Sequence, residues 1–86
     1  MTIHVQNQAG KPLSRYQTIV YAYPSGRYVR GGLTRVDGNA TYDLVDGAYQ
    51  YRVRKGDYAS DRLPADGFMV APPPPGDDQV YVHVVP

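Results

Sequence analysis

Apolar and polar residues alternate with a period of two along most of the chain. Residues 2–8 place Ile3 and Val5 on one face and polar side chains on the other, and residues 18–24 are rich in β-branched and aromatic side chains. Because successive side chains of a strand point to opposite faces, this period predicts half-buried β-strands. No segment carries a helical period of useful length. The pattern therefore predicts an all-β chain.

Two Asp-Gly pairs, at residues 37–38 and 46–47, divide the middle of the chain. An Asp-Gly pair between alternating segments is a strong signal for a two-residue hairpin turn of type I′. Residues 33–36, 40–44 and 49–53 flank these turns and alternate in the same way. We expect them to form an antiparallel meander in which tyrosine rings of neighbouring strands pair across the sheet.

The end of the chain, residues 79–85, also reads as a strand. We expect alternate residues to face the core, which are Val80, Val82 and Val84. Tyr81 and His83 are then expected to face solvent, and the first and last strands to lie side by side. Short strands at intervals of about 8–12 residues predict two packed sheets. The expected fold is all-β, a seven-stranded antiparallel Greek-key β-sandwich that forms a single domain over residues 1–86.

The composition supports this prediction. All eight acidic residues are Asp, Glu is absent, and Arg outnumbers Lys by seven to two. Exposed helix faces are usually rich in Glu, Lys and Leu, whereas turns and strands favour Asp, Gly, Val, Thr and Tyr. The chain has no cysteine, which excludes disulfides, thiolate metal ligands and a cysteine nucleophile.

The charges exclude some classes of partner. The net charge of +1 is spread along the chain and forms no basic patch, so we expect no nucleic-acid partner. No apolar run of signal-peptide length follows Met1, and no segment approaches the roughly 20 apolar residues of a membrane span. We therefore expect synthesis in the cytoplasm and no membrane insertion, and we leave the final location open.

Five short motifs follow one another along nearly the whole chain. They are GKPL at residues 10–13, VYAY at 20–23, TRVDGNATYDL at 34–44, DGAYQYRV at 46–53 and GDY at 56–58. Their order resembles the transthyretin-like, or prealbumin-like, β-sandwich superfamily, which includes carboxypeptidase regulatory-like domains and repeat domains of bacterial surface proteins. The resemblance implies a transthyretin-like or immunoglobulin-like sandwich, and it is compatible with a module that only binds or builds.

A weaker resemblance is to the hydroxyisourate hydrolases. It is carried by IHV at residues 3–5, the GKP that follows, and a late His-Val pair. This resemblance implies that His4 and His83 face one cleft and activate water. The chain departs from those enzymes because Asn39 stands where they carry an Arg after the Asp-Gly turn, and because Pro86 replaces their Tyr-Arg-Gly-Ser ending. We therefore expect no enzyme, and keep a hydrolase with catalytic His4 and His83 as an alternative.

Tyrosine is unusually frequent, with nine in 86 residues. Tyr42, Tyr49 and Tyr51 lie on apolar faces and are expected in the core. The other six cannot all fit inside so small a domain, and tyrosine is enriched at interfaces. The expected interface consists of these six and a stiff polyproline segment, namely Tyr16, Tyr21, Tyr23, Tyr28, Tyr58, Tyr81, Pro72, Pro73, Pro74 and Pro75.

We therefore expect a non-enzymatic structural or adhesive module that forms a homo-oligomer or docks on a larger protein assembly. A capsid decoration or accessory protein of a bacteriophage virion is one example. A second alternative is a carbohydrate-binding module that uses exposed Tyr21, Tyr23 or Tyr28. No cofactor or metal is expected, since the acids of the late loops match no calcium-binding spacing and are interpreted as solvated turn residues, namely Asp57, Asp61, Asp77 and Asp78.

Overall fold

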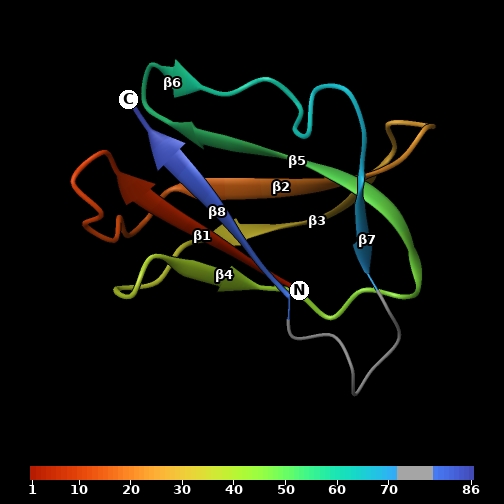
Figure 1. Ribbon diagram of the computed structural model, residues 1–86, viewed down its shortest axis with the longest axis horizontal. Helices are drawn as coiled ribbons and strands as arrows, with labels where there is room; N and C mark the ends of the chain where they lie inside the picture. The colour runs from red at the N-terminus through yellow and green to blue at the C-terminus, as the bar shows by residue number, and fades with distance from the viewer. Residues whose placement is uncertain (72–78) are drawn as a thin grey trace.

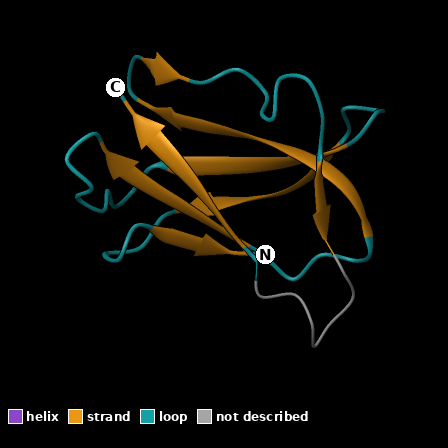
Figure 2. Cartoon of the chain, viewed as in Figure 1, coloured by secondary structure: helices purple, strands orange, loops and turns teal. Residues whose placement is uncertain are grey.

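The computed structural model describes residues 1–71 and 79–86, and this part of the chain is all-β (Figure 1, Figure 2). It contains eight strands, which are β1 (Thr2–Asn7), β2 (Gln17–Ala22), β3 (Tyr28–Leu33), β4 (Asn39–Thr41), β5 (Gly47–Lys55), β6 (Tyr58–Ala59), β7 (Met69–Ala71) and β8 (Val80–Val85). In the described residues we find no helix that is long and apolar enough to cross a membrane.

The strands form two sheets. The smaller sheet has the order β4-β1-β8, in which β1 runs antiparallel to β4 and parallel to β8. The larger sheet has the order β3-β2-β5-β6, and β7 pairs with another part of β5. The prediction that the first and last strands lie side by side is confirmed. Figure 1 shows β8 crossing in front of β2, so the sheets form two layers.

The core lies between these layers. Both sheets contribute to a single cluster of buried apolar side chains, whose members include Ile3, Val5 and Val85 from the smaller sheet and Val20, Tyr49, Tyr51, Val53 and Met69 from the larger. The predicted core positions of Tyr49 and Tyr51 are confirmed, and Tyr42 is half-buried against the cluster. Met1 is also buried in the cluster, and its ammonium group donates a hydrogen bond to the Tyr42 carbonyl at 3.1 Å. The inward-facing residues of the alternating strands thus form one shared core.

The predicted meander around the two Asp-Gly pairs is wrong. The first pair does form a turn, in which the Gly38 N–H donates to the Arg35 carbonyl at 2.9 Å. However, only Gly38 has a positive φ, whereas a type I′ turn requires one at both central residues. The turn carries the chain from one sheet to the other, so that β4 pairs with β1 and β5 pairs with β2. These partners bury Ala40 beside Ile3, a long-range contact that the local turn signal does not report.

The predicted phase of the last strand is also wrong. Its valines face solvent, with exposed fractions of 58% for Val80, 54% for Val82 and 47% for Val84. His83 and Val85 point into the core instead. The parallel register places His83 opposite Val5, which is fully buried, so the two side chains share the inner face of the sheet.

Candidate functional site

The outer face of the smaller sheet is the first candidate site. We define it by the side chains that point away from the core, namely Thr2, His4 and Gln6 of β1, Asn39 and Thr41 of β4, and Val80, Val82 and Val84 of β8. The strand registers arrange these side chains in rows: His4 lies between Asn39 and Val82, and Thr2 lies between Thr41 and Val80.

Hydrogen bonds order the β1–β4 half of this face. His4 Nδ1 lies 2.6 Å from Asn39 Oδ1, and the hydroxyls of Thr2 and Thr41 lie 3.0 Å apart. Both are directly opposed cross-strand pairs, which stabilise a sheet modestly. The polar half is therefore a short ladder whose side chains already bond to one another.

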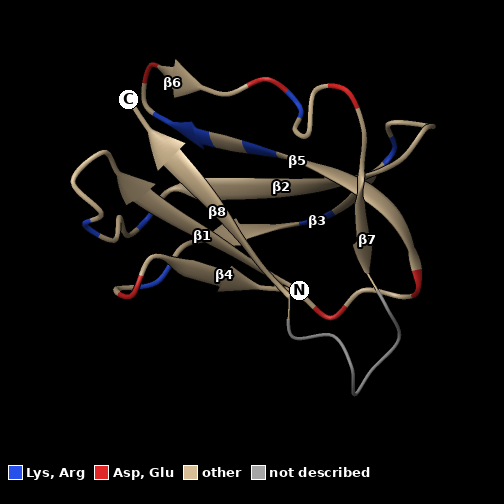
Figure 3. Cartoon of the chain, viewed as in Figure 1, with Lys and Arg blue, Asp and Glu red and all other residues tan. Residues whose placement is uncertain are grey.

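The strands of the outer face lack acidic and strongly basic side chains. None of the three strands contains Lys, Arg, Asp or Glu, whereas charged residues line β5 and the loops (Figure 3). Depletion of charge at the centre of a surface is a compositional feature of protein interfaces. Next to the polar ladder, the three valines of β8 form an exposed apolar stripe. Their burial against a partner would be favourable, because apolar surface gains free energy when it leaves water.

β8 is also an edge strand. It pairs with β1 on one side, and none of the described strands pairs with its other side. A free strand edge presents unpaired N–H and C=O groups to any chain that can add a strand. Natural edge strands usually carry a Lys, a Pro or a bulge that blocks this pairing. Residues 80–85 have none of these, since their register with β1 is continuous and their sequence is VYVHVV.

On the inner side of β8, His83 joins the two sheets through tyrosine hydroxyls. Its Nδ1 lies 3.1 Å from Tyr51 Oη and its Nε2 lies 2.8 Å from Tyr58 Oη. Burial lowers the pKa of His83 below its ordinary value of 6.5, because the charged ring loses its hydration. A neutral imidazole has one donor and one acceptor nitrogen, so one tyrosine donates to His83 and the other accepts from it.

The tyrosines of this network titrate at high pH. Burial, with a smaller contribution from Tyr58, raises the pKa of Tyr51 to about 12. Burial also raises the pKa of Tyr58, followed by the influence of Tyr16, whose ring meets Tyr58 edge-on at a centroid distance of 6.5 Å. At neutral pH the hydroxyls of Tyr51 and Tyr58 are therefore protonated and can serve as donors. The network holds β8 against β5 and provides no nucleophile.

The two histidines of the hydrolase alternative do not face one cleft. His4 points to the outer face of the sheet and bonds to Asn39, whereas His83 points to the inner face and bonds to Tyr51 and Tyr58. The expectation that His83 is exposed is wrong, since its exposed fraction is 7%. Because the sheet separates the two imidazoles, they cannot act together on one water molecule.

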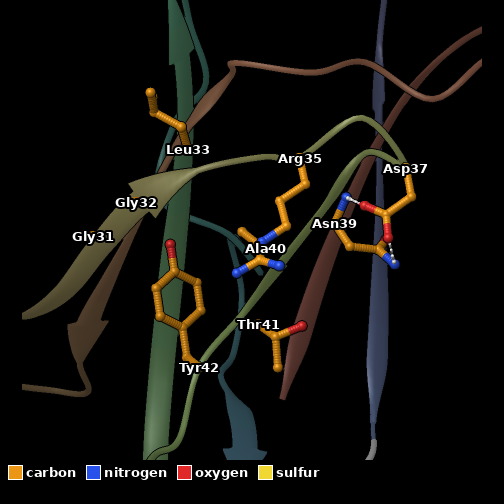
Figure 4. A pocket seen from close by; sticks show the side chains of 9 residues that line it. All are labelled: Gly31, Gly32, Leu33, Arg35, Asp37, Asn39, Ala40, Thr41 and Tyr42. Atoms are coloured by element: carbon orange, nitrogen blue, oxygen red, sulfur yellow. Dashed lines mark hydrogen bonds between the residues drawn. The ribbon is translucent and has the colours of Figure 1, made fainter.

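A polar cleft opens between β3 and the β4 arm of the chain (Figure 4). Its volume is about 420 Å³, and it is lined by Gly31, Gly32, Leu33, Arg35, Asp37, Asn39, Ala40, Thr41 and Tyr42. Arg35 extends into it, and Tyr42 is held at one end by the Thr18 carbonyl, to which its hydroxyl donates at 3.2 Å. Its lining combines one Arg and one Asp with hydroxyl and amide side chains, which suits the binding of a small polar molecule.

The six tyrosines predicted at an interface divide into three groups. Tyr28 is 62% exposed, and Tyr23 stacks on exposed Phe68 with ring centroids 5.1 Å apart. Tyr21 is buried, and the Arg62 guanidinium lies 3.9 Å from the centre of its ring, so the expectation that it is exposed is wrong. The remaining three are half-buried against the core, namely Tyr16, Tyr58 and Tyr81.

Two further predictions fall partly or wholly outside the described residues. The polyproline segment, Pro72 to Pro75, lies there, as do Asp77 and Asp78. Within residues 1–71 and 79–86, we find no group of three or more His, Cys, Asp or Glu that could hold a metal ion. No protein-family model, curated protein or solved structure matches this chain.

Sequence reasoning missed the outer face. Its signal was present, because residues 2–7, 39–41 and 80–85 are all free of charged residues. The sequence does not show that these three segments share one sheet, because the local turn signal predicts a different neighbour for β4. The predicted phase of β8 places its valines in the core, so the valine stripe is not expected either.

Proposed function

We propose that the protein is a non-enzymatic structural or adhesive module that self-associates or docks on a larger assembly, and that it does so through β8. The observation that carries this proposal is the coincidence of two features on one strand. None of the described strands pairs with the outer edge of β8, and its outward side chains are three exposed valines beside a sheet face without Lys, Arg, Asp or Glu. A capsid decoration or accessory protein would be one case of this function.

The two features support the proposal in different ways. An added strand would satisfy the unpaired backbone groups of the edge, which is how many domains capture extended segments. The valines would supply apolar area next to that strand, at about 25 cal/mol for each Å² removed from water. An added strand that buries little apolar area would bind weakly. An apolar surface without a free strand edge would not fix the orientation of its partner. The alternatives of hydrolase and carbohydrate binding have no comparable observation in their favour.

The finer fold assignment belongs to the same proposal. We infer a Greek-key sandwich of the transthyretin-like or immunoglobulin-like kind, in which β6 is a two-residue addition to seven other strands. Two sheets that share one core, and a first strand placed between β4 and β8, support this inference. Sandwiches of this kind often have their contacts on exposed strand edges, as β8 would here.

Size-exclusion chromatography with light scattering tests the function. The wild-type protein should show a mass above that of the monomer that increases with concentration. Val82→Lys should restore the monomer, because it places a charge in the centre of the stripe. Val36→Lys is the matched control, since Val36 is 89% exposed and lies in the turn before β4, outside the outer face. A monomeric wild type that binds no partner assembly, or equal behaviour of the two variants, would contradict the proposal.

A further inference from the structure

We propose that the partner of β8 is a second copy of the same strand, paired antiparallel about a two-fold axis at Val82. This inference rests on the proposed function and adds the identity of the partner and the register. It depends on which residues of β8 direct their backbone groups to the free edge. In a strand, the N–H and C=O of one residue point to the same side, and successive residues alternate.

A single hydrogen bond establishes this alternation. The Thr2 N–H donates to the Gln79 carbonyl at 2.8 Å, and Thr2 is registered with Val80. In a parallel pair, a residue bonds to the two neighbours of the residue opposite it. Gln79 and every second residue after it therefore face β1. The residues that face the free edge are those between them, namely Val80, Val82 and Val84.

The same three valines thus carry the unpaired backbone groups and the exposed side chains. When two copies of β8 pair antiparallel about an axis at Val82, Val82 lies opposite its own copy and Val80 lies opposite Val84. All three valines then form hydrogen-bonded pairs, with about six inter-strand hydrogen bonds in total. An axis at Tyr81 or at His83 brings only two of the three into such pairs. The Val82 register is therefore the one that leaves no edge group of β8 unpaired.

The chemistry of the strand favours an identical partner. Residues 80–85 carry no Lys, Arg, Asp or Glu, so two copies meet without repulsion between like charges. Directly opposed side chains in an antiparallel pair lie on the same face of the sheet. The valines of both copies would therefore form one apolar row on the outer face of a continuous six-stranded sheet. Such an interface is isologous, which is the usual form of a dimer with two-fold symmetry.

The expected dimer is reversible. A contact made by one edge strand is smaller than the about 800 Å² per partner that stable complexes bury. We therefore expect dilution to shift the equilibrium to the monomer, and the dimer to be populated at high protein concentration. Because the dimer dissociates on dilution, its register is determined by covalent crosslinking.

Single cysteine variants provide that trap, because the chain has no cysteine of its own. In a hydrogen-bonded antiparallel pair the Cα atoms are about 5.5 Å apart, which is within the range that a disulfide spans. Val82→Cys should therefore oxidise to a covalent dimer. Val84→Cys alone should not, because its partner would be four residues away along the strand. An equimolar mixture of Val80→Cys and Val84→Cys should give the mixed dimer.

The outcomes separate the inference from the function. Each variant is first shown to be folded by far-ultraviolet circular dichroism, which is expected because all three side chains are exposed. Crosslinking of Val82→Cys together with the mixed dimer supports the inference. Efficient crosslinking of Val84→Cys alone, or a mixed dimer between Val80→Cys and Val82→Cys, overturns the register but leaves self-association through β8 intact. Absence of any crosslink among the cysteine variants overturns the second copy of β8 as the partner. If the wild type is in addition a monomer that binds no partner assembly, the proposed function is overturned as well.

Discussion

Gly38 should be one of the least replaceable residues of the fold. It has a φ of +81°, and a Cβ built on it would lie 2.7 Å from the Val5 carbonyl oxygen and 2.9 Å from Pro12 Cβ. Real Cβ atoms do not approach other heavy atoms this closely. The Gly38 carbonyl in turn accepts a hydrogen bond from the Val5 N–H at 2.8 Å, so the turn is fastened to the central strand of the smaller sheet. The turn cannot move away without losing this bond.

Gly38→Ala combines two separate costs. An L-residue in the left-handed region loses about 1–2 kcal/mol relative to glycine. Overlap with a packed neighbour that cannot move freely adds about 1–3 kcal/mol, and here the nearest neighbour is backbone. We therefore expect a loss of about 2–5 kcal/mol in the free energy of unfolding. That is a large part of the about 5–15 kcal/mol that stabilises a typical domain.

Two matched glycines isolate the two costs. Gly10 has a φ of +84° but nothing within 4 Å of its Cβ position, so Gly10→Ala should show the conformational cost alone. Gly67 has open space and no positive φ, so Gly67→Ala should change stability by less than about 1 kcal/mol. Urea unfolding monitored by circular dichroism measures all three, in the Val82→Lys background so that association does not contribute. If Gly38→Ala costs no more than Gly10→Ala, the close approach to Val5 does not exist and the reasoning is wrong.

Two further predictions concern the network around His83. Below pH 6.5 the unfolded chain binds a proton at His83, whereas the folded chain does so only below its lowered pKa. The free energy of unfolding should therefore decrease as the pH falls from 6.5 to that lowered pKa, by at most about 1.4 kcal/mol per pH unit. The free energy of unfolding, measured with urea, should lose this pH dependence in His83→Gln and keep it in His4→Gln. The same pH dependence in both variants would contradict the assignment to His83. Tyr51→Phe should cost about 1–3 kcal/mol, since it leaves a buried nitrogen unpaired, whereas Tyr58→Phe should cost less because Tyr58 is half-buried and water can replace its hydroxyl. Equal losses of stability would contradict the difference in burial.

The strands themselves could be predicted from the sequence because their signal is local. The alternation along β1 and β5 matches the observed burial, and the core positions of Tyr49 and Tyr51 follow from the same period. Strand pairing could not be predicted in the same way. The Asp37-Gly38 signal indicates a turn, but it contains no information about whether the next strand returns to the same sheet. Here the burial of Ala40 beside Ile3 decides the partner, and that contact spans 37 positions in sequence.

The phase of β8 illustrates a second limit of sequence reasoning. The segment VYVHVV has apolar residues in both phases, since one face carries Val80, Val82 and Val84 and the other carries Tyr81, His83 and Val85. Hydrophobicity alone favours burial of the three valines. The opposite phase is adopted because two tyrosine hydroxyls meet both nitrogens of His83 and satisfy them inside the core. Partners that come from β5 and β6 are not visible from the strand itself.

That phase has a consequence for the isolated molecule. A one-residue change of register would exchange the two faces of β8 completely, so the strand must either bury its histidine or bury its valines. Burying the histidine needs two specific tyrosines and costs hydration, while the valines stay in water. For a domain that acts alone, this arrangement leaves apolar surface in water without any gain in stability. For a domain whose outer face meets a partner, it places the apolar surface where the contact forms, and the free edge of the same strand gives that contact its direction. This is the physical reason to look for the activity of this protein in what β8 binds.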